Sequence, residues 1–460
     1  MPRTVVVNVV GLTERLLASG RMPRLAKFAA GQRTLRVAPV LPAVTCSAQA
    51  TYLTGKWPRG HGVVGNGWYD RDLAEHQFWK QSNRLMQGPK LWHALRAARP
   101  DATTAQLFWW FNMHAEVEYS VTPRPLYPAD GRKVFDIHTQ PMELREEAKA
   151  ALGEFPFPRF WGPAAGRGAS DWIAACARWV EEKHGPDLSL VYLPHLDYGL
   201  QKFGPDLADA RVAAELAVAD EIAGGLVEYF AGRGVTVAVL SEYGITPVAR
   251  PVHLNRVLRR HGWLSLKEEL GRETLDEGGC AAWALADHQV AQVYVRKPEL
   301  LPKVRAALEE TPGVERVLDE DGKRAAGLDH SRSGDLVAVA AADAWFTYYF
   351  WEDDARAPDY ARTVDIHRKP GYDPVELFLD PKLAAPKLRV AWRLLQKKLG
   401  LRMLMDVIPL DATLVRGSHG RTPEDGRDWP VLIGPVAAPT TAKELGATEV
   451  FGKLLGLAKG

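Results

Sequence analysis

The sequence predicts an α/β protein built on a mostly parallel sheet with helices on both faces. Three short apolar runs, 4–10, 188–193 and 235–240, are typical of buried parallel strands, and each ends in a polar or glycine-bearing turn. Apolar residues recur on one helical face within 207–230, which makes a strand–helix–strand unit with the last two runs. Chemistry gathers at the carboxyl ends of parallel strands, so the residues that follow these runs are the first candidates for a site.

The chain of 460 residues is expected to form one large core with two additions. Residues 1–250 and 331–460 are assigned to the core, and 57–165 is interpreted as a tryptophan-, proline- and glycine-rich insertion without regular sheet. Residues 251–330 are predicted to form a small α/β lid. That prediction follows from two strand-like runs that flank a helix-like one, 288–295, 299–310 and 314–318.

Composition excludes several classes of protein. The 58 Lys and Arg balance 56 Asp and Glu, so the net charge is +2, and nucleic acid is not an expected partner. The three cysteines make no disulfide framework, which favours a reducing compartment. No apolar run reaches the length of a membrane span, and no leader segment is recognisable, so a cytoplasmic location is expected. The oligomeric state stays open.

Tryptophan is the unusual residue, with 15 in all and nine between Trp57 and Trp179. Such rings usually pack a core or a lid. Their concentration after the candidate nucleophile described next also suggests the wall of a pocket for an organic substrate, and both interpretations stay open.

The strongest local motif is the run 42–58, PAVTCSAQATYLTGKWP, followed by GHGVVGN at 60–66. Thr45 is predicted to enter a helix, where a hydroxyl faces free backbone N–H groups; the plain alternative is that it only caps that helix. The motif resembles the nucleophile segment of the alkaline phosphatase superfamily, in particular a divergent bacterial group of type I phosphodiesterase/nucleotide pyrophosphatase-like proteins. The resemblance implies that Thr45 is the nucleophile. A sulfatase is disfavoured because Cys46 lies one position too late.

The same resemblance implies a metal centre whose ligands are only partly present. In the phosphodiesterase branch two zinc-type ions are held by Asp and His side chains. Asp197 and His419 match that pattern, whereas Gln201 stands where a His is expected. Glu242 and Tyr243 replace an Asp-His pair. We therefore expect one or two divalent ions, Zn, Mn or Mg, held by these five residues, with a harder ion favoured by the oxygen ligands.

Other polar residues are candidates for substrate binding. The first-strand Asp of the family corresponds to Val10, and Asn8 is the polar side chain two residues earlier on the same strand face. Gln49 lies next to the position of the family's phosphate-orienting Asn. His195 would reach the pocket if the strand continued past 193, and the Arg332 guanidinium suits a phosphate. The alternative for His195 is a buried structural histidine, and the alternative for Arg332 is an ion pair that braces the lid.

The predicted function is metal-dependent hydrolysis of a phosphate ester of a small organic molecule, a phosphodiester or a phosphomonoester. Thr45 would form a phospho-enzyme intermediate. The alternative is a superfamily member that has lost catalysis and binds a phosphorylated or aromatic metabolite or a protein partner. Val10, Gln201 and Tyr243 favour that alternative.

Overall fold

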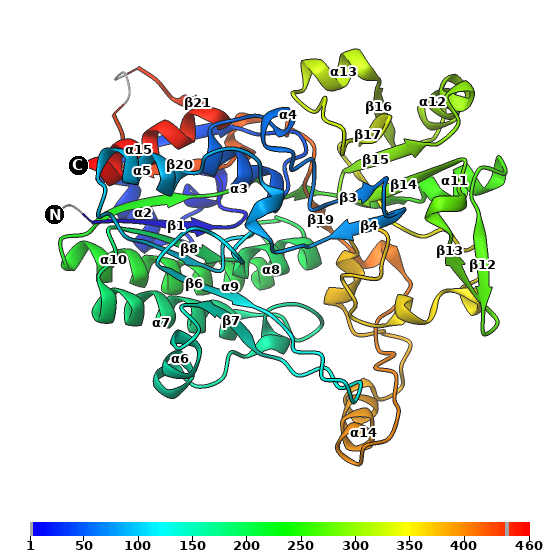
Figure 1. Cartoon of the computed structure of the whole chain (residues 1–460), viewed down its shortest axis with the longest axis horizontal. Coiled ribbons are helices and arrows are strands. Elements are labelled where there is room, and N and C mark those ends of the chain that lie inside the picture. The colour runs from blue at the N-terminus through cyan, green and yellow to red at the C-terminus, as the bar shows by residue number, and fades with distance from the viewer. Residues whose placement is uncertain (1–2, 438–440) are drawn as a thin grey trace.

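The computed structural model describes residues 3–437 and 441–460 and has a nine-stranded sheet at its centre (Figure 1). The strand order is β21 (Glu444–Gly446), β2 (Arg33–Ala38), β20 (Val431–Gly434), β9 (Thr236–Leu240), β1 (Thr4–Val9), β8 (Leu188–Leu193), β5 (Thr104–Leu107), β6 (Tyr119–Pro123) and β7 (Ile137–Gln140). β1 pairs in parallel with both β8 and β9 and is buried along its whole length. Its β-branched residues suit a strand covered on both faces.

Helices cover both faces of this sheet, as the apolar pattern predicts. On one face lie α3 (Thr45–Thr54), α5 (Leu91–Ala98) and α15 (Val450–Lys459), and α15 contacts both of the others (Figure 1). On the other face lie α7 (Arg167–His184), α8 (His195–Phe203), α9 (Ala210–Ala219) and α10 (Gly225–Gly232), with α2 (Pro23–Ala30) beside β2. The predicted fold class, an α/β core with a mostly parallel sheet, is confirmed.

The interpretation of 57–165 as an insertion without regular sheet is wrong. This segment supplies β5, β6 and β7 to the central sheet, in addition to α4 (Pro58–His61), α6 (Leu144–Leu152) and the small hairpin β3 (Gly67–Asp70) with β4 (Glu75–Phe78). The three strands are only four or five residues long. Alternation over so few residues is hard to detect between long proline- and tryptophan-rich connections.

A second, antiparallel sheet lies beside the first and has its own apolar cluster. Its order is β14 (Ala282–Asp287), β15 (Val290–Val295), β17 (Leu336–Ala340) and β16 (Val314–Leu318), and α11 (Leu254–Arg260), α12 (Leu301–Glu309) and α13 (Glu320–Ala325) accompany it. The strands predicted near 290 and 314 are present, but β17 lies between them. β17 comes from beyond residue 330, so this sheet takes a strand from the segment assigned to the core.

Short pairings join the two sheets. β10 (Thr246–Pro247) pairs with β19 (Gly417–Ser418), and β11 (Arg250–Val252) pairs with β18 (Ala344–Phe346). Further along, the hairpin β12 (Leu266–Glu269) with β13 (Arg272–Leu275) and helix α14 (Pro386–Lys398) extend outward (Figure 1). Across residues 3–437 and 441–460, no helix combines the length and the apolar character that crossing a bilayer requires.

Candidate active site

Most of the predicted site residues meet where the parallel strands end. Asn8 lies near the end of β1, Asp197 lies on the first turn of α8 after β8, and Glu242 and Tyr243 directly follow β9. Thr45 is the first residue of α3. His419 follows β19 and completes the cluster. The register of β1, β8 and β9 places these ends side by side, as the topology of an open parallel sheet requires.

Thr45 does not cap its helix. The N-cap of α3 is Val44, and that end has no side-chain capping bond, so the plain alternative for Thr45 is not what the structure contains. The Thr45 Oγ1 lies 3.3 Å from the Tyr243 hydroxyl. Thr45 is buried, with 4% of the residue exposed.

Glu242 is held by two amides. Asn8 Nδ2 and Gln49 Nε2 both donate to its Oε1, at 2.5 Å each, and Gln49 Oε1 accepts the backbone N–H of Trp110 at 2.7 Å. Burial raises the pKa of Glu242 to about 8, although hydrogen bonds from Gln49, Asn8 and Thr45 act in the opposite direction. Among the described residues, the other carboxyl oxygen, Oε2, has no hydrogen-bond partner.

Asp197 has a neutral donor on each oxygen. The Tyr243 hydroxyl donates to Oδ1 at 3.1 Å, and Gln201 Nε2, one helical turn away on α8, donates to Oδ2 at 2.6 Å. The Tyr372 hydroxyl in turn donates to Gln201 Oε1 at 3.0 Å. Burial raises the pKa of Asp197 to about 7, which its hydrogen bonds with Tyr243 and Gln201 only partly offset.

Four aromatic rings form a column beside these carboxyls. Tyr243 stacks on His419 at 3.5 Å and 5°, His419 contacts His288 at 3.7 Å, and His288 stacks on Tyr372 at 3.7 Å. His419 Nδ1 lies 2.8 Å from the Ala43 carbonyl, which only accepts, so Nδ1 carries the proton. Burial, followed by the nearby His288, lowers the pKa of His419 well below its usual value. His419 Nε2 is therefore a buried acceptor.

Several members of this site lie outside the set of predicted site residues. Tyr372 and His288 close the ring column, and Asp287 accepts both the backbone and the side-chain N–H of Asn66, at 2.8 and 3.0 Å. Asn66 Oδ1 accepts the Cys46 backbone N–H at 3.0 Å, so the GHGVVGN segment orders the first turn of α3. Asn66 belongs to the GHGVVGN motif, so the sequence could have indicated it. Tyr372 contacts residues that are far away in the sequence, and such contacts leave no local sequence pattern.

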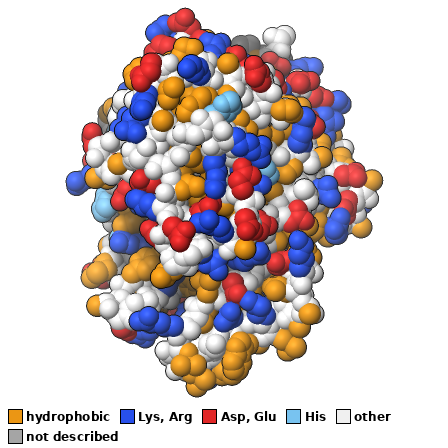
Figure 2. Space-filling model, turned by 90° about the vertical axis from the view of Figure 1, so that its right-hand side faces the viewer, with side chains coloured by type: hydrophobic (Ala, Val, Ile, Leu, Met, Phe, Trp, Pro, Cys, Tyr) orange, Lys and Arg blue, Asp and Glu red, His pale blue; other side chains and the backbone are white. Residues whose placement is uncertain are grey.

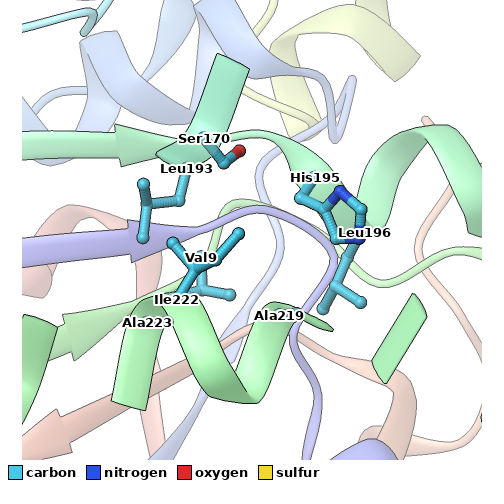
Figure 3. A pocket seen from close by; sticks show the side chains of 8 residues that line it. All are labelled: Val9, Ser170, Leu193, His195, Leu196, Ala219, Ile222 and Ala223. Atoms are coloured by element: carbon cyan, nitrogen blue, oxygen red, sulfur yellow. The ribbon is translucent and has the colours of Figure 1, made fainter. Parts of the chain in front are cut away.

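His195 does not join the cluster. β8 ends at Leu193, and His195 is the first residue of helix α8. On a helix, unlike a strand, side chains two residues apart point to different faces. The prediction that the strand continues and carries His195 into the pocket is therefore wrong. His195 lines a small cavity of about 10 Å³ with Val9, Ser170, Leu193, Leu196, Ala219, Ile222 and Ala223 (Figure 3). Its Nε2 lies 2.7 Å from Glu215 Oε2. This cavity has room for a single water molecule.

Arg332 also lies outside the cluster. Its Nη1 donates to the carbonyls of Gly62 and Leu85, at 2.8 and 2.7 Å, and its guanidinium lies 4.6 Å from the centre of the Trp68 ring. The predicted phosphate-binding role is therefore not supported by its position. Arg332 fastens the small sheet to the GHGVVGN segment.

The donor set does not fit a two-ion centre. Within 3–437 and 441–460, no three His, Cys, Asp or Glu side chains gather as a metal site would require. Gln201 and Tyr243 offer their hydrogens, not lone pairs, to Asp197. One pair does suit a single cation: His419 Nε2 is a buried acceptor with no hydrogen-bond partner in the described chain, and it lies 3.8 Å from Asp197 Oδ1.

Fold and site together define an α/β protein of the alkaline phosphatase-like class, with a hydroxyl residue at a helix start facing buried carboxyls. A family model for type I phosphodiesterase/nucleotide pyrophosphatase matches residues 4–373. The chain therefore belongs to this family of phosphate-ester hydrolases.

The relatives agree with this assignment. An uncharacterised pyrophosphatase/phosphodiesterase of Schizosaccharomyces pombe is 25% identical over 285 residues, which are 60% of this chain and 50% of the relative. The chain thus matches about half the length of this curated relative. Murine ectonucleotide pyrophosphatase/phosphodiesterase 5 has a TM-score of 0.59 at 16% identity, with 99% of this chain and 95% of that one covered.

Phosphonoacetate hydrolase from Sinorhizobium meliloti, solved with phosphonoformate, has a TM-score of 0.62 at 14% identity, with 99% and 96% covered. At such identities these two structures establish a shared fold.

Proposed function

We propose that this protein hydrolyses a phosphate ester of a small organic molecule, with Thr45 as the nucleophile. The observation that carries the proposal is the position of Thr45: it begins a ten-residue helix, is buried, and lies between the Tyr243 hydroxyl and the Glu242 carboxyl. A phosphate placed there meets the positive end of the helix dipole, where the Cys46 N–H is already taken by Asn66 Oδ1. An inactive threonine-to-alanine variant of the murine relative was solved with AMP, which supports a threonine in this role.

Glu242 is the base that the geometry offers to Thr45. Its Oε1 is occupied by Asn8 and Gln49, while Oε2 is buried without a hydrogen-bond partner among the described residues. In the first step Thr45 Oγ1 bonds to phosphorus, its proton passes to Glu242, and the bond from phosphorus to the departing alcohol breaks. The alcohol oxygen takes a proton from water. The hydroxide left from that water attacks phosphorus, the bond from phosphorus to Thr45 breaks, and Glu242 returns its proton to the Thr45 oxygen.

Asp197 and His419 are the residues that would hold one divalent cation, Zn, Mn or Mg, and such an ion would neutralise charge on the phosphate. Tyr243 orients Asp197 beside Thr45 through its hydroxyl. Trp79 and Trp161 flank Tyr372 at 6.1 and 5.5 Å between ring centres, and both are partly exposed. They are partly exposed aromatic surfaces beside the ring column, which suit an organic substituent.

The test is hydrolysis of an aryl phosphodiester and an aryl phosphomonoester by the full chain, metal-free and with each of the three ions. Thr45→Val keeps the shape and removes the hydroxyl, so it should lose activity about a thousandfold, whereas Thr45→Ser should retain a measurable rate. Activity of Thr45→Val equal to that of the unmodified protein would remove Thr45 from the mechanism.

The competing function is binding without turnover, and the observation in its favour is that Gln201 and Tyr243 already satisfy both oxygens of Asp197. Under that function none of the ions produces hydrolysis of either ester. Instead, a phosphate ester or an aromatic metabolite raises the melting temperature of the unmodified chain.

A further inference from the structure

Helix α14 carries an unusual concentration of positive charge. Residues 381–405 contain seven Lys or Arg and no Asp or Glu, although the whole chain is nearly neutral. Figure 1 shows α14 at the end of a projection, away from the central sheet. In the space-filling view, hydrophobic side chains gather at this lower end of the molecule with Lys and Arg above them (Figure 2).

The inner side of α14 is tied to its own neighbourhood. Arg389 and Arg393 both pair with Asp406, the latter through Nη2 at 3.0 Å, and Val390 packs against the apolar cluster around Trp351. These contacts determine which side of the helix faces outward.

The outer side bears an apolar stripe that no described residue covers. Leu388, Trp392, Leu395 and Leu399 follow a spacing of four, three and four residues, which places them on one helical face. They are 72%, 57%, 45% and 64% exposed. Lys387 and Lys398 border the stripe and form no ion pair with any described residue. We call this surface the α14 face.

A second segment adds to the same end. Phe135 and Tyr127 are 43% and 65% exposed, and the Phe135 ring lies 5.8 Å from the ammonium of Lys397 on α14. The residues around them, 124–135, include Arg124, Arg132 and Lys133, while their single acid, Asp130, is paired with Arg132. Two segments far apart in the sequence thus present aromatic and basic side chains together.

We propose that the α14 face docks on the surface of an anionic phospholipid bilayer, with α14 lying in the plane of the headgroups. Thirteen residues span about 20 Å, too short to cross a bilayer, whereas a Trp- and Leu-lined stripe bordered by lysines is suited to the boundary between headgroups and acyl chains. A second copy of this chain, docked on the α14 face through its own α14 face, would bring like positive charges together. Nucleic acid would leave the leucines exposed. This proposal goes beyond the phosphate-ester hydrolysis and does not depend on it.

The test is co-sedimentation of the full chain with vesicles of phosphatidylcholine alone and of phosphatidylcholine mixed with phosphatidylglycerol. Binding is expected only to the anionic vesicles and should weaken as salt is raised. Trp392→Ser with Leu395→Ser should weaken it at least about tenfold, because less apolar surface enters the interface. Lys387→Gln with Lys398→Gln should weaken it about 25-fold, at about fivefold for each cationic side chain.

Matched controls lie elsewhere on the surface. Leu270→Ser removes a fully exposed leucine at the β12–β13 turn, and Lys297→Gln with Lys303→Gln removes two exposed lysines near α12; both should bind like the unmodified chain. All variants should keep its melting temperature. No sedimentation with anionic vesicles, or unchanged binding of the Trp392/Leu395 variant, would overturn the proposal. A dimer of the unmodified chain that this variant makes monomeric in analytical ultracentrifugation would overturn it too.

Discussion

The Tyr243 ring lies parallel to the His419 imidazole, with 3.5 Å between ring centres and 5° between planes. The stack aims the Tyr243 hydroxyl at Asp197 and at Thr45, at 3.1 and 3.3 Å. Tyr243 therefore links the threonine to the carboxyl through one hydroxyl. Hydrogen bonds thus join the Thr45 side of the site to the Asp197 side.

Tyr243→Phe should keep the ring stack and lose this link. One oxygen of buried Asp197 loses its donor, so the free energy of unfolding is expected to fall by about 1–3 kcal/mol. We expect kcat for an aryl phosphodiester to fall about tenfold, because Thr45 and Asp197 lose the hydroxyl that positions them. The control is Tyr372→Phe, which removes a hydroxyl from Gln201 at the far end of the column. An equal fall in kcat in both variants would contradict the proposal that the effect of Tyr243→Phe comes from the lost contact with Thr45.

Stability should decrease as pH rises, because buried Glu242 favours its protonated form. Its pKa is raised in the folded chain to about 8, above the ordinary value of 4.5, so the folded state binds more protons between these values. The contribution is fully present below about pH 4.5 and is lost as pH rises through about 8. Urea unfolding of the unmodified chain and of Glu242→Gln across this window should give a shallower pH dependence for the variant. Identical slopes would mean that Glu242 ionises normally.

Gln201→His should create a zinc site. The new imidazole would join Asp197 and His419, and three such ligands suit Zn²⁺ better than an amide does. We expect zinc affinity to rise at least about tenfold, measured by calorimetry and by elemental analysis of the purified chain. Gln49→His is the comparison variant. It places an imidazole beside Glu242, where no other histidine of the described residues is in contact. Equal zinc affinity in the two variants would show that Asp197 and His419 do not act as a pair.

Arg332→Lys should affect stability and spare catalysis. Lysine loses the planar fork that holds the Gly62 and Leu85 carbonyls and the stacking on Trp68, so the free energy of unfolding is expected to fall by about 1–3 kcal/mol. The KM for both aryl esters should stay within about twofold. A large rise in KM with unchanged stability would instead place Arg332 on the substrate phosphate.

Much of the fold was predictable because its strands are locally encoded. The runs at 188–193 and 235–240 are largely apolar over six residues, and they coincide with β8 and β9 nearly residue for residue. β5, β6 and β7 were missed because four or five residues carry too little alternation. Their strand identity comes from pairing with β8 and with each other.

The sequence by itself determined the family, the helix that Thr45 begins, and the altered residues at 201, 242 and 243, because these are properties of short motifs. Only the tertiary structure decided what those residues do to one another. It stacks Tyr372 on His288 and places His288 against His419. It also turns His195 away into a cavity and gives Asp197 hydrogen-bond donors in place of further metal ligands. Several of these contacts join side chains from different parts of the sequence, as His288 and His419 do, and burial sets the charge states of the groups involved. Neither property is encoded in a local pattern.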